Sequence, residues 1–190
     1  MVSNMILFID ACVRTHSRTK KIAEKLLERL GEEVTEVRLS EVEFPETDED
    51  FLGKRDGYMA VGNFDDPYFD LAKQFAKADT IVIAAPYWDL SFPAVLKQYI
   101  EHINVLGITF EYSEEGIPIG LCKANKLYYV MTAGGSYVPE EFGFGYVKAL
   151  AQNFYGIKDV ELIKATGLDI QGNDADEVIQ NCINSLKRYV

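Results

Sequence analysis

Apolar residues fall along the chain in short continuous runs, separated by stretches with helical periodicity. The runs at 5–9, 80–85 and 126–132 are rich in β-branched and aromatic residues, which is typical of strands buried on both faces. A further strand is predicted at 158–166. Residues 34–39 instead alternate apolar and polar positions, which predicts a strand at the edge of a sheet. The pattern therefore predicts five strands.

The stretches between these runs repeat apolar residues at helical spacing. The first predicted helix follows Ser17, a preferred N-cap residue, and ends at Gly31, a preferred residue just past a helix. Further helices are predicted at about 67–78, 93–103, 140–155 and 173–188. We expect residues 40–65, which carry many acids, to form the least regular connection, and residues 107–120 to form a hairpin-like excursion.

Strands that alternate with helices predict βαβ units, whose right-handed crossovers build a doubly wound parallel sheet. An α/β sheet of five strands fits the flavodoxin-like order 2-1-3-4-5, in which ligands bind at the switch point beside the first and third strands. Three loops would converge there, at 10–19, 86–92 and 132–137. We expect a single domain over residues 1–190.

Charge and cysteine content narrow the classes of partner. The chain has 30 acidic and 19 basic residues and a net charge of −11, which argues against nucleic acid or an anionic membrane as the main partner. No apolar run approaches the roughly 20 residues that span a bilayer, and the N-terminus shows no signal-peptide pattern. Cys12, Cys122 and Cys182 lie far apart and fit neither a disulfide framework nor a zinc site. We therefore expect a cytoplasmic protein.

The first loop offers the elements of an anion site. Hydroxyls at Thr15, Ser17 and Thr19, and guanidinium groups at Arg14 and Arg18, gather where a helix begins. Free amides and the helix dipole favour anions at such a place, so the loop suits one phosphate group. The loop contains no glycine, so it is neither a dinucleotide fingerprint nor a Walker-type loop. An ordinary capped helix with solvated charges explains the same residues equally well.

The other two loops offer walls for a flat ligand. Tyr87, Trp88 and Phe92 supply aromatic surface after the central strand, although aromatic residues often serve only the core or an interface. Gly134 and Gly135 allow the backbone to approach a planar group and to present amide donors, although a plain strand-to-helix turn also uses glycine. Together, a phosphate site, a planar slot and backbone donors at one edge indicate a mononucleotide such as FMN.

Three segments of the chain resemble a known protein family. Residues 78–100 (ADTIVIAAPYWDLSFPAVLKQYI), 107–116 (GITFEYSEEG) and 132–135 (TAGG) resemble the FMN-dependent NADH-azoreductase and NAD(P)H:quinone oxidoreductase family. The resemblance leaves out residues 40–66. It implies that FMN passes a hydride from NADH or NADPH to a quinone or azo compound by a ping-pong mechanism, without a side-chain nucleophile. It also implies a homodimer with the site at the interface, for which the hairpin at 108–119 is the expected surface.

The resemblance further implies roles for individual residues. Azoreductases often carry Asn at the position of Asp89 and Arg at that of Ala133, so a negative charge beside the flavin is expected to lower its reduction potential. His102 is expected to be structural, while Tyr112 and Tyr137 are candidates for the substrate slot or for packing. The implied FMN contacts are Ser17, Arg18 and Thr19 at the phosphate, Pro86, Tyr87, Trp88 and Asp89 against the ring, and Thr132, Ala133, Gly134 and Gly135 along its polar edge.

Two other readings compete with this one. Cys12 and Arg18 have the spacing of the phosphate loop of low-molecular-weight tyrosine phosphatases, and Asp66-Pro67-Tyr68 resembles their general-acid motif. That loop also carries a Gly-Asn pair and a second cysteine that are absent here. The general acid of those phosphatases comes late in the chain, whereas Asp66 lies in its first half. A flavodoxin-type electron carrier shares the acidic surface, but its phosphate loop contains a glycine that this chain lacks.

Overall fold

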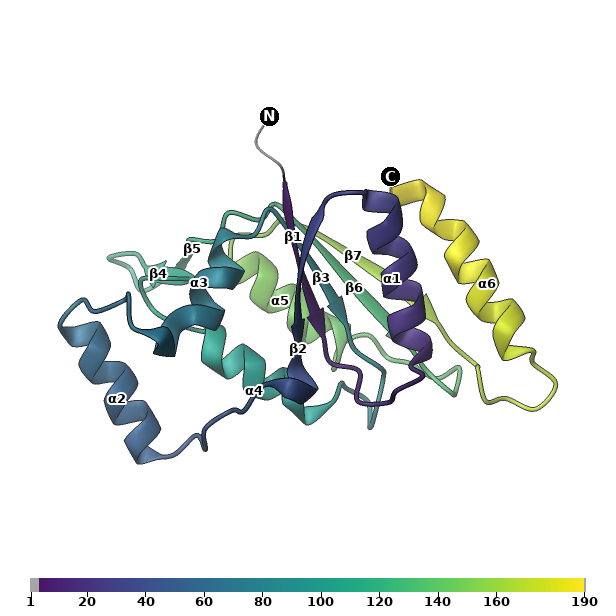
Figure 1. Cartoon of the computed structure of the whole chain (residues 1–190), viewed down its shortest axis with the longest axis horizontal. Coiled ribbons are helices and arrows are strands. Elements are labelled where there is room, and N and C mark those ends of the chain that lie inside the picture. Colours follow the sequence, from purple (N-terminus) through teal and green to yellow (C-terminus); the bar gives the residue numbers. More distant parts are fainter. Residues whose placement is uncertain (1–3, 190) are drawn as a thin grey trace.

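A five-stranded parallel sheet forms the centre of the protein in the computed structural model, which describes residues 4–189. Its strands follow the order β2-β1-β3-β6-β7, which corresponds to the predicted order 2-1-3-4-5 and confirms the predicted fold class. The predicted edge strand lies at one margin of the sheet (Figure 1). The strands are β1 (Met5–Asp10), β2 (Glu33–Arg38), β3 (Thr80–Ala84), β6 (Lys126–Thr132) and β7 (Asp159–Ala165).

Helices cover both faces of the sheet, as Figure 1 shows. One face carries α1 (Arg18–Leu30) and α6 (Ala175–Ser185), and the other carries α3 (Asp70–Lys77), α4 (Ala94–Ile103) and α5 (Phe144–Asn153). Alternate residues of β1 serve the two cores: Leu7 and Ile9 pack toward α3–α5, whereas Ile6 and Phe8 pack toward α1 and α6. Burial on both sides explains the unbroken apolar run of this strand.

The first helix begins and ends where the sequence predicts. The hydroxyl of Ser17 accepts a hydrogen bond from the amide of Lys20 at 3.2 Å, which satisfies a donor that the helix itself leaves unpaired. Gly31 follows the helix with a φ of 65°, a left-handed conformation that glycine adopts at little cost. Both capping predictions are confirmed.

The prediction of an irregular connection over residues 40–65 is wrong, because this segment contains η1 (Leu39–Glu41) and a three-turn helix, α2 (Glu49–Ala60). The carboxylate of Asp48 caps α2 by accepting from the amide of Phe51 at 2.8 Å. Phe51 is the buried residue of this helix, and its ring packs on His102 with centroids 4.8 Å apart. Tyr58 and Met59 are partly buried beside it, but these few residues form no continuous apolar stripe, so periodicity alone misses the helix.

The remaining short elements complete the chain. The turn η2 (Pro67–Phe69) leads into α3, and η3 (Leu186–Tyr189) follows α6. The predicted hairpin is confirmed as β4 (Phe110–Tyr112) paired antiparallel with β5 (Pro118–Gly120). In Figure 1 it lies at the upper left, well away from the lower ends of the central strands. Among residues 4–189, none of the helices has the length and apolar character needed to cross a membrane.

Candidate functional site

A cavity of about 410 Å³ lies where the three predicted loops meet at the carboxyl ends of the strands. Its volume is in the usual range for small-molecule sites. All the residues predicted to bind FMN line this cavity except Asp89 and Gly135. The full lining comprises Val13, Arg14, His16, Ser17, Arg18, Thr19, Pro86, Tyr87, Trp88, Thr132, Ala133, Gly134, Leu168 and Asp169.

The start of α1 forms one end of the cavity. The Ser17 hydroxyl is used by the helix cap, and the buried hydroxyls of Thr19 and Thr132 share a hydrogen bond of 2.7 Å. The hydroxyls of Ser17 and Thr19, both predicted to bind phosphate, therefore already have partners within the protein. Within residues 4–189, no hydrogen bond uses the amides of Arg18 and Thr19, which is normal for a first helical turn. The donors left for an anion are these amides and the Arg18 guanidinium.

Arg18 reaches a residue that the sequence analysis missed. Its guanidinium lies 2.8 Å from the carboxylate of Asp169, which comes from the loop after β7. The two side chains are 46% and 66% exposed, so solvent screens the pair and its net contribution is about 0–1 kcal/mol. The signal that could have found Asp169 is topological, because the last strand also ends at this edge and brings a fourth loop with it.

The loops after β3 and β6 form the other end of the cavity. The amide of Tyr87 donates to the carbonyl of Thr132 at 2.9 Å, and the Tyr87 hydroxyl donates to Pro139 at 3.2 Å, so the two loops are joined. An added Cβ at Gly134 would lie 2.3 Å from the Asp169 carboxylate, so this exposed side chain would have to move aside. Within the described residues, the amides of Gly134 and Gly135 donate to no acceptor. This end therefore offers two backbone donors.

Asp89 lies beyond the cavity lining because the chain turns sharply there. Trp88 and Ser91 exchange two backbone hydrogen bonds of 3.1 and 2.7 Å, and between them Asp89 and Leu90 have φ angles of 49° and 66°. Two successive left-handed residues define a type I′ turn. Aspartate tolerates this conformation, but a bulky residue such as Leu90 is strained in it.

Replacing Leu90 with glycine should raise the free energy of unfolding by about 0.5–1 kcal/mol. The left-handed conformation costs an L-residue roughly 1–2 kcal/mol, and the greater freedom of glycine in the unfolded chain offsets part of the gain. Urea unfolding followed by circular dichroism measures the change. Asp89→Gly is the matched variant and should gain less, because aspartate is already better suited to the turn. A loss of stability in Leu90→Gly would contradict the strain.

Cys12 does not have the properties of a phosphatase nucleophile. The residue is 7% exposed, and its thiol donates to the Ala84 carbonyl at 3.7 Å. Burial raises the pKa of this thiol to about 12, against a smaller opposing effect of the nearby Ser17 hydroxyl. The nucleophilic form of cysteine is the thiolate, which is scarce near neutral pH at such a pKa. Asp66 caps η2 by accepting from the amide of Tyr68 at 3.0 Å.

Three other residues with predicted roles lie outside the cavity lining. His102 lies on α4 outside the cavity lining, packed against Phe44 and Phe51, as a structural residue would be. Tyr112 lies on the hairpin, and Tyr137 is 81% exposed; neither lines the cavity. Between residues 4 and 189, no group of three His, Cys, Asp or Glu side chains is arranged to hold a metal ion.

Comparisons with known proteins agree with this geometry. A family model described as flavodoxin-like fold matches residues 4–190, which gives the class of protein. An FMN-dependent NADH:quinone oxidoreductase of Clostridium beijerinckii is 35% identical over 193 residues, covering 97% of this chain and 96% of the relative. One from Coprothermobacter proteolyticus is 32% identical over 195 residues, covering 96% of each chain.

Solved structures give the same result. An azoreductase from Bacillus anthracis str. Sterne has a TM-score of 0.81 and 25% identity, with 98% of each chain covered. An FMN-dependent NADH-azoreductase from Bacillus anthracis str. Ames Ancestor, solved in complex with FMN, also has a TM-score of 0.81 and 25% identity, covering 98% of this chain and 97% of that one. The chain belongs to the family of FMN-dependent NADH:quinone oxidoreductases and azoreductases, which are oxidoreductase enzymes. The resemblance found in the sequence is confirmed.

Proposed function

We propose that this chain, as one domain, binds FMN in the cavity and carries a hydride from NADH or NADPH to a quinone or azo acceptor. The observation that carries the proposal is the cavity itself. It has Arg18 and helix amides at one end and glycine amides at the other, and none of these amides has a hydrogen-bond partner within residues 4–189. When bound, FMN would supply the chemistry by accepting a hydride from the nicotinamide and passing it to the acceptor in a ping-pong cycle.

The residues of the cavity would divide the work. Arg18 and the first-turn amides of α1 would hold the phosphate, with Ser17 and Thr19 contributing their backbone while their hydroxyls fix the loop. Pro86, Tyr87 and Trp88 would form one wall of the ring slot and exclude water from it. The amides of Gly134 and Gly135 would donate to the polar edge of the ring and stabilise negative charge there. Their lack of competing acceptors supports this role.

Asp89 and Ala133 would set the electrostatics of the slot. Ala133 supplies no cation, and Asp89 is exposed in the turn that follows Trp88. We propose that Asp89 lowers the flavin potential only modestly, because solvent screens a charge outside the cavity lining.

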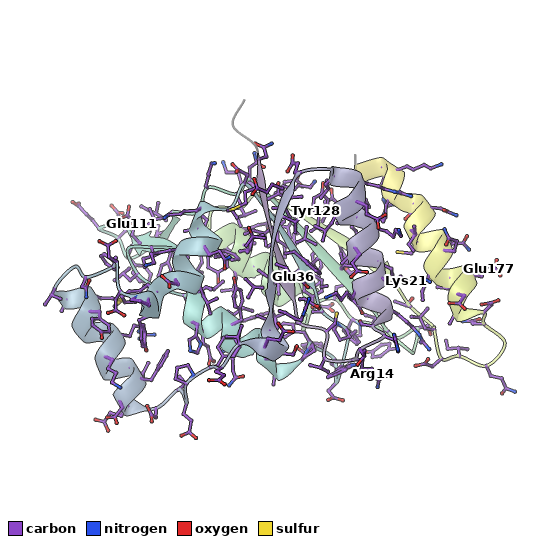
Figure 2. The ribbon with its side chains drawn as sticks, viewed as in Figure 1. Arg14, Lys21, Glu36, Glu111, Tyr128 and Glu177 are labelled. Carbon is purple, nitrogen blue, oxygen red and sulfur yellow. The ribbon has the colours of Figure 1, made fainter. Side chains whose placement is uncertain are left out.

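We also propose that the protein acts as a homodimer in the cytoplasm. The exposed apolar residues include Ile117 and Ile119 on the hairpin, and Leu90, Tyr137 and Phe142 on the loops that follow β3 and β6. Figure 2 shows Arg14, which lines the cavity, far from Glu111 on the hairpin. A hairpin residue such as Tyr112 would therefore meet a cavity only in a second copy. The thiols of Cys12, Cys122 and Cys182 are all free, which supports a reducing compartment.

Anaerobic reduction tests the proposed function directly. The purified protein should be yellow, release FMN on denaturation, and lose its flavin absorbance when NADH or NADPH is added. Addition of a quinone or an azo dye should then restore the flavin absorbance, and the protein should sediment as a dimer at micromolar concentration. A colourless protein, or one whose flavin is not reduced by either nicotinamide, would contradict the enzyme proposal. A monomer that is fully active would contradict only the dimer.

A further inference from the structure

Asp10 is a buried carboxylate directly beneath the loop that begins the cavity. It is the last residue of β1 and is 1% exposed. A buried carboxylate is costly unless it is paired and hydrogen-bonded, so its partners identify its role. One oxygen accepts from the amide of Cys12 at 2.9 Å, and the other lies 2.7 Å from the ammonium of Lys20 in the first turn of α1. A single side chain therefore contacts both ends of the loop.

Lys20 compensates the charge of Asp10. Its ammonium also lies 2.7 Å from Glu36, which Figure 2 labels on β2, and 5.9 Å from the centre of the Phe8 ring. Burial alone would lower the pKa of Lys20, but hydrogen bonds to Asp10 and Glu36 outweigh this effect and raise it. Lys20 therefore remains charged over the whole neutral range. Since its ammonium pairs with two carboxylates below the loop, Lys20 is not available to pair with a phosphate in the cavity.

Cys12 is itself anchored to the sheet. Its thiol donates to the Ala84 carbonyl at the end of β3. Asp10 thus fixes Cys12 at the start of the loop and Lys20 where the helix begins. Neither Asp10 nor Lys20 lines the 410 Å³ cavity, so neither is placed to contact a ligand there.

We infer that Asp10 is a positioning residue for the phosphate end of the cavity, acting through Cys12 and Lys20. This inference rests on the proposed function. The carboxylate holds residues 12–19 in one arrangement, so that the amides of Arg18 and Thr19 are aimed at the anion before it arrives. Pre-arranged donors bind more tightly because less conformational freedom is lost on binding.

Comparison of FMN with riboflavin tests the inference, because riboflavin has the same ring and no phosphate. Quenching of flavin fluorescence gives both affinities for the apoprotein. Asp10→Ala should weaken FMN binding about tenfold or more, the factor that corresponds to one lost charge-assisted contact. Riboflavin binding should change less than about twofold. Asp10→Asn keeps an oxygen for the Cys12 amide and should weaken FMN binding only about threefold.

Glu36→Gln is the matched control, since it removes the outer partner of Lys20 and leaves Asp10 in place. It should leave both affinities within about twofold. Equal weakening of FMN and riboflavin by Asp10→Ala would indicate a general structural role and overturn the inference, as would unchanged or tighter FMN binding. If Asp10→Ala does not fold by circular dichroism, the FMN-to-riboflavin ratio of Asp10→Asn decides. Failure of the unmodified protein to bind FMN would instead contradict the proposed function.

Discussion

Replacing Gly120 with alanine is expected to lower the free energy of unfolding by about 3 kcal/mol, at the upper end of the usual cost of overpacking. An added Cβ at this position would lie 2.2 Å from the backbone nitrogen of Gly156 and 2.2 Å from the carbonyl carbon of Tyr155. No change of side-chain rotamer relieves a clash with backbone. The opposing segment is also fixed, because Tyr155 is 3% exposed and its hydroxyl donates to Asn104 at 2.5 Å. Urea unfolding followed by circular dichroism measures the loss.

The matched control for this prediction is Gly53→Ala. Gly53 lies inside α2, and nothing lies within 4 Å of the position of its added Cβ. Alanine is a better helix former, so this variant should be about 0.5–1 kcal/mol more stable than the unmodified protein. A loss below about 1 kcal/mol for Gly120→Ala would mean that the hairpin can move away from Tyr155 at little cost.

Replacing Gly134 with alanine is expected to weaken FMN binding by up to about fivefold, because the Arg18–Asp169 pair that it displaces is exposed and contributes at most about 1 kcal/mol. The added methyl group would lie 2.3 Å from the Asp169 carboxylate, so this side chain has to leave its position. Its movement removes the partner that holds Arg18 across the cavity. Both ends of the proposed FMN site are therefore disturbed by one methyl group. Flavin fluorescence quenching measures the affinity.

A second substitution separates the clash from a direct block of the ligand. In Gly134→Ala/Asp169→Ala the carboxylate is gone, so the methyl group has room and the two changes should not be additive. The double variant should bind FMN more tightly than Gly134→Ala alone. If it binds as weakly, the methyl group obstructs the ligand itself and the contact with Asp169 is not the cause.

The strands were predictable because burial requires apolar residues, and runs of apolar residues are visible in the sequence. A strand covered by helices on both faces is mostly apolar, as β1 is from Met5 to Ile9, whereas β2 lies at the edge, carries polar residues and buries only Val37. Helix α2 has no such run. It is held by the Asp48 cap, the buried ring of Phe51 and the partly buried side chains of Tyr58 and Met59, and its glycines gave no reason to expect a helix.

At the site, the sequence indicates which loops meet but not which side chains form hydrogen bonds or ion pairs with one another. The hydroxyl of Thr19 forms a hydrogen bond with that of Thr132, which is 113 positions away along the chain, and no local sequence pattern predicts this contact. The same holds for Asp169 and Arg18. The type I′ turn at Asp89 and Leu90 was also hidden, since this turn normally uses Asn-Gly or Asp-Gly and the leucine here contradicts that preference. Long-range packing determines these features.

The hydrogen bond between Thr19 and Thr132 has a consequence for how the cavity selects its ligand. It joins the first turn of α1 to the end of β6, and the Tyr87 amide joins the loop after β3 to the same residue. Three of the walls thus meet at one buried residue, so widening the opening would break one of these hydrogen bonds. Joined walls gain affinity for a ligand of matching thickness because little reorganisation accompanies binding. A thicker ligand would have to break one of these hydrogen bonds, and the opening therefore disfavours it.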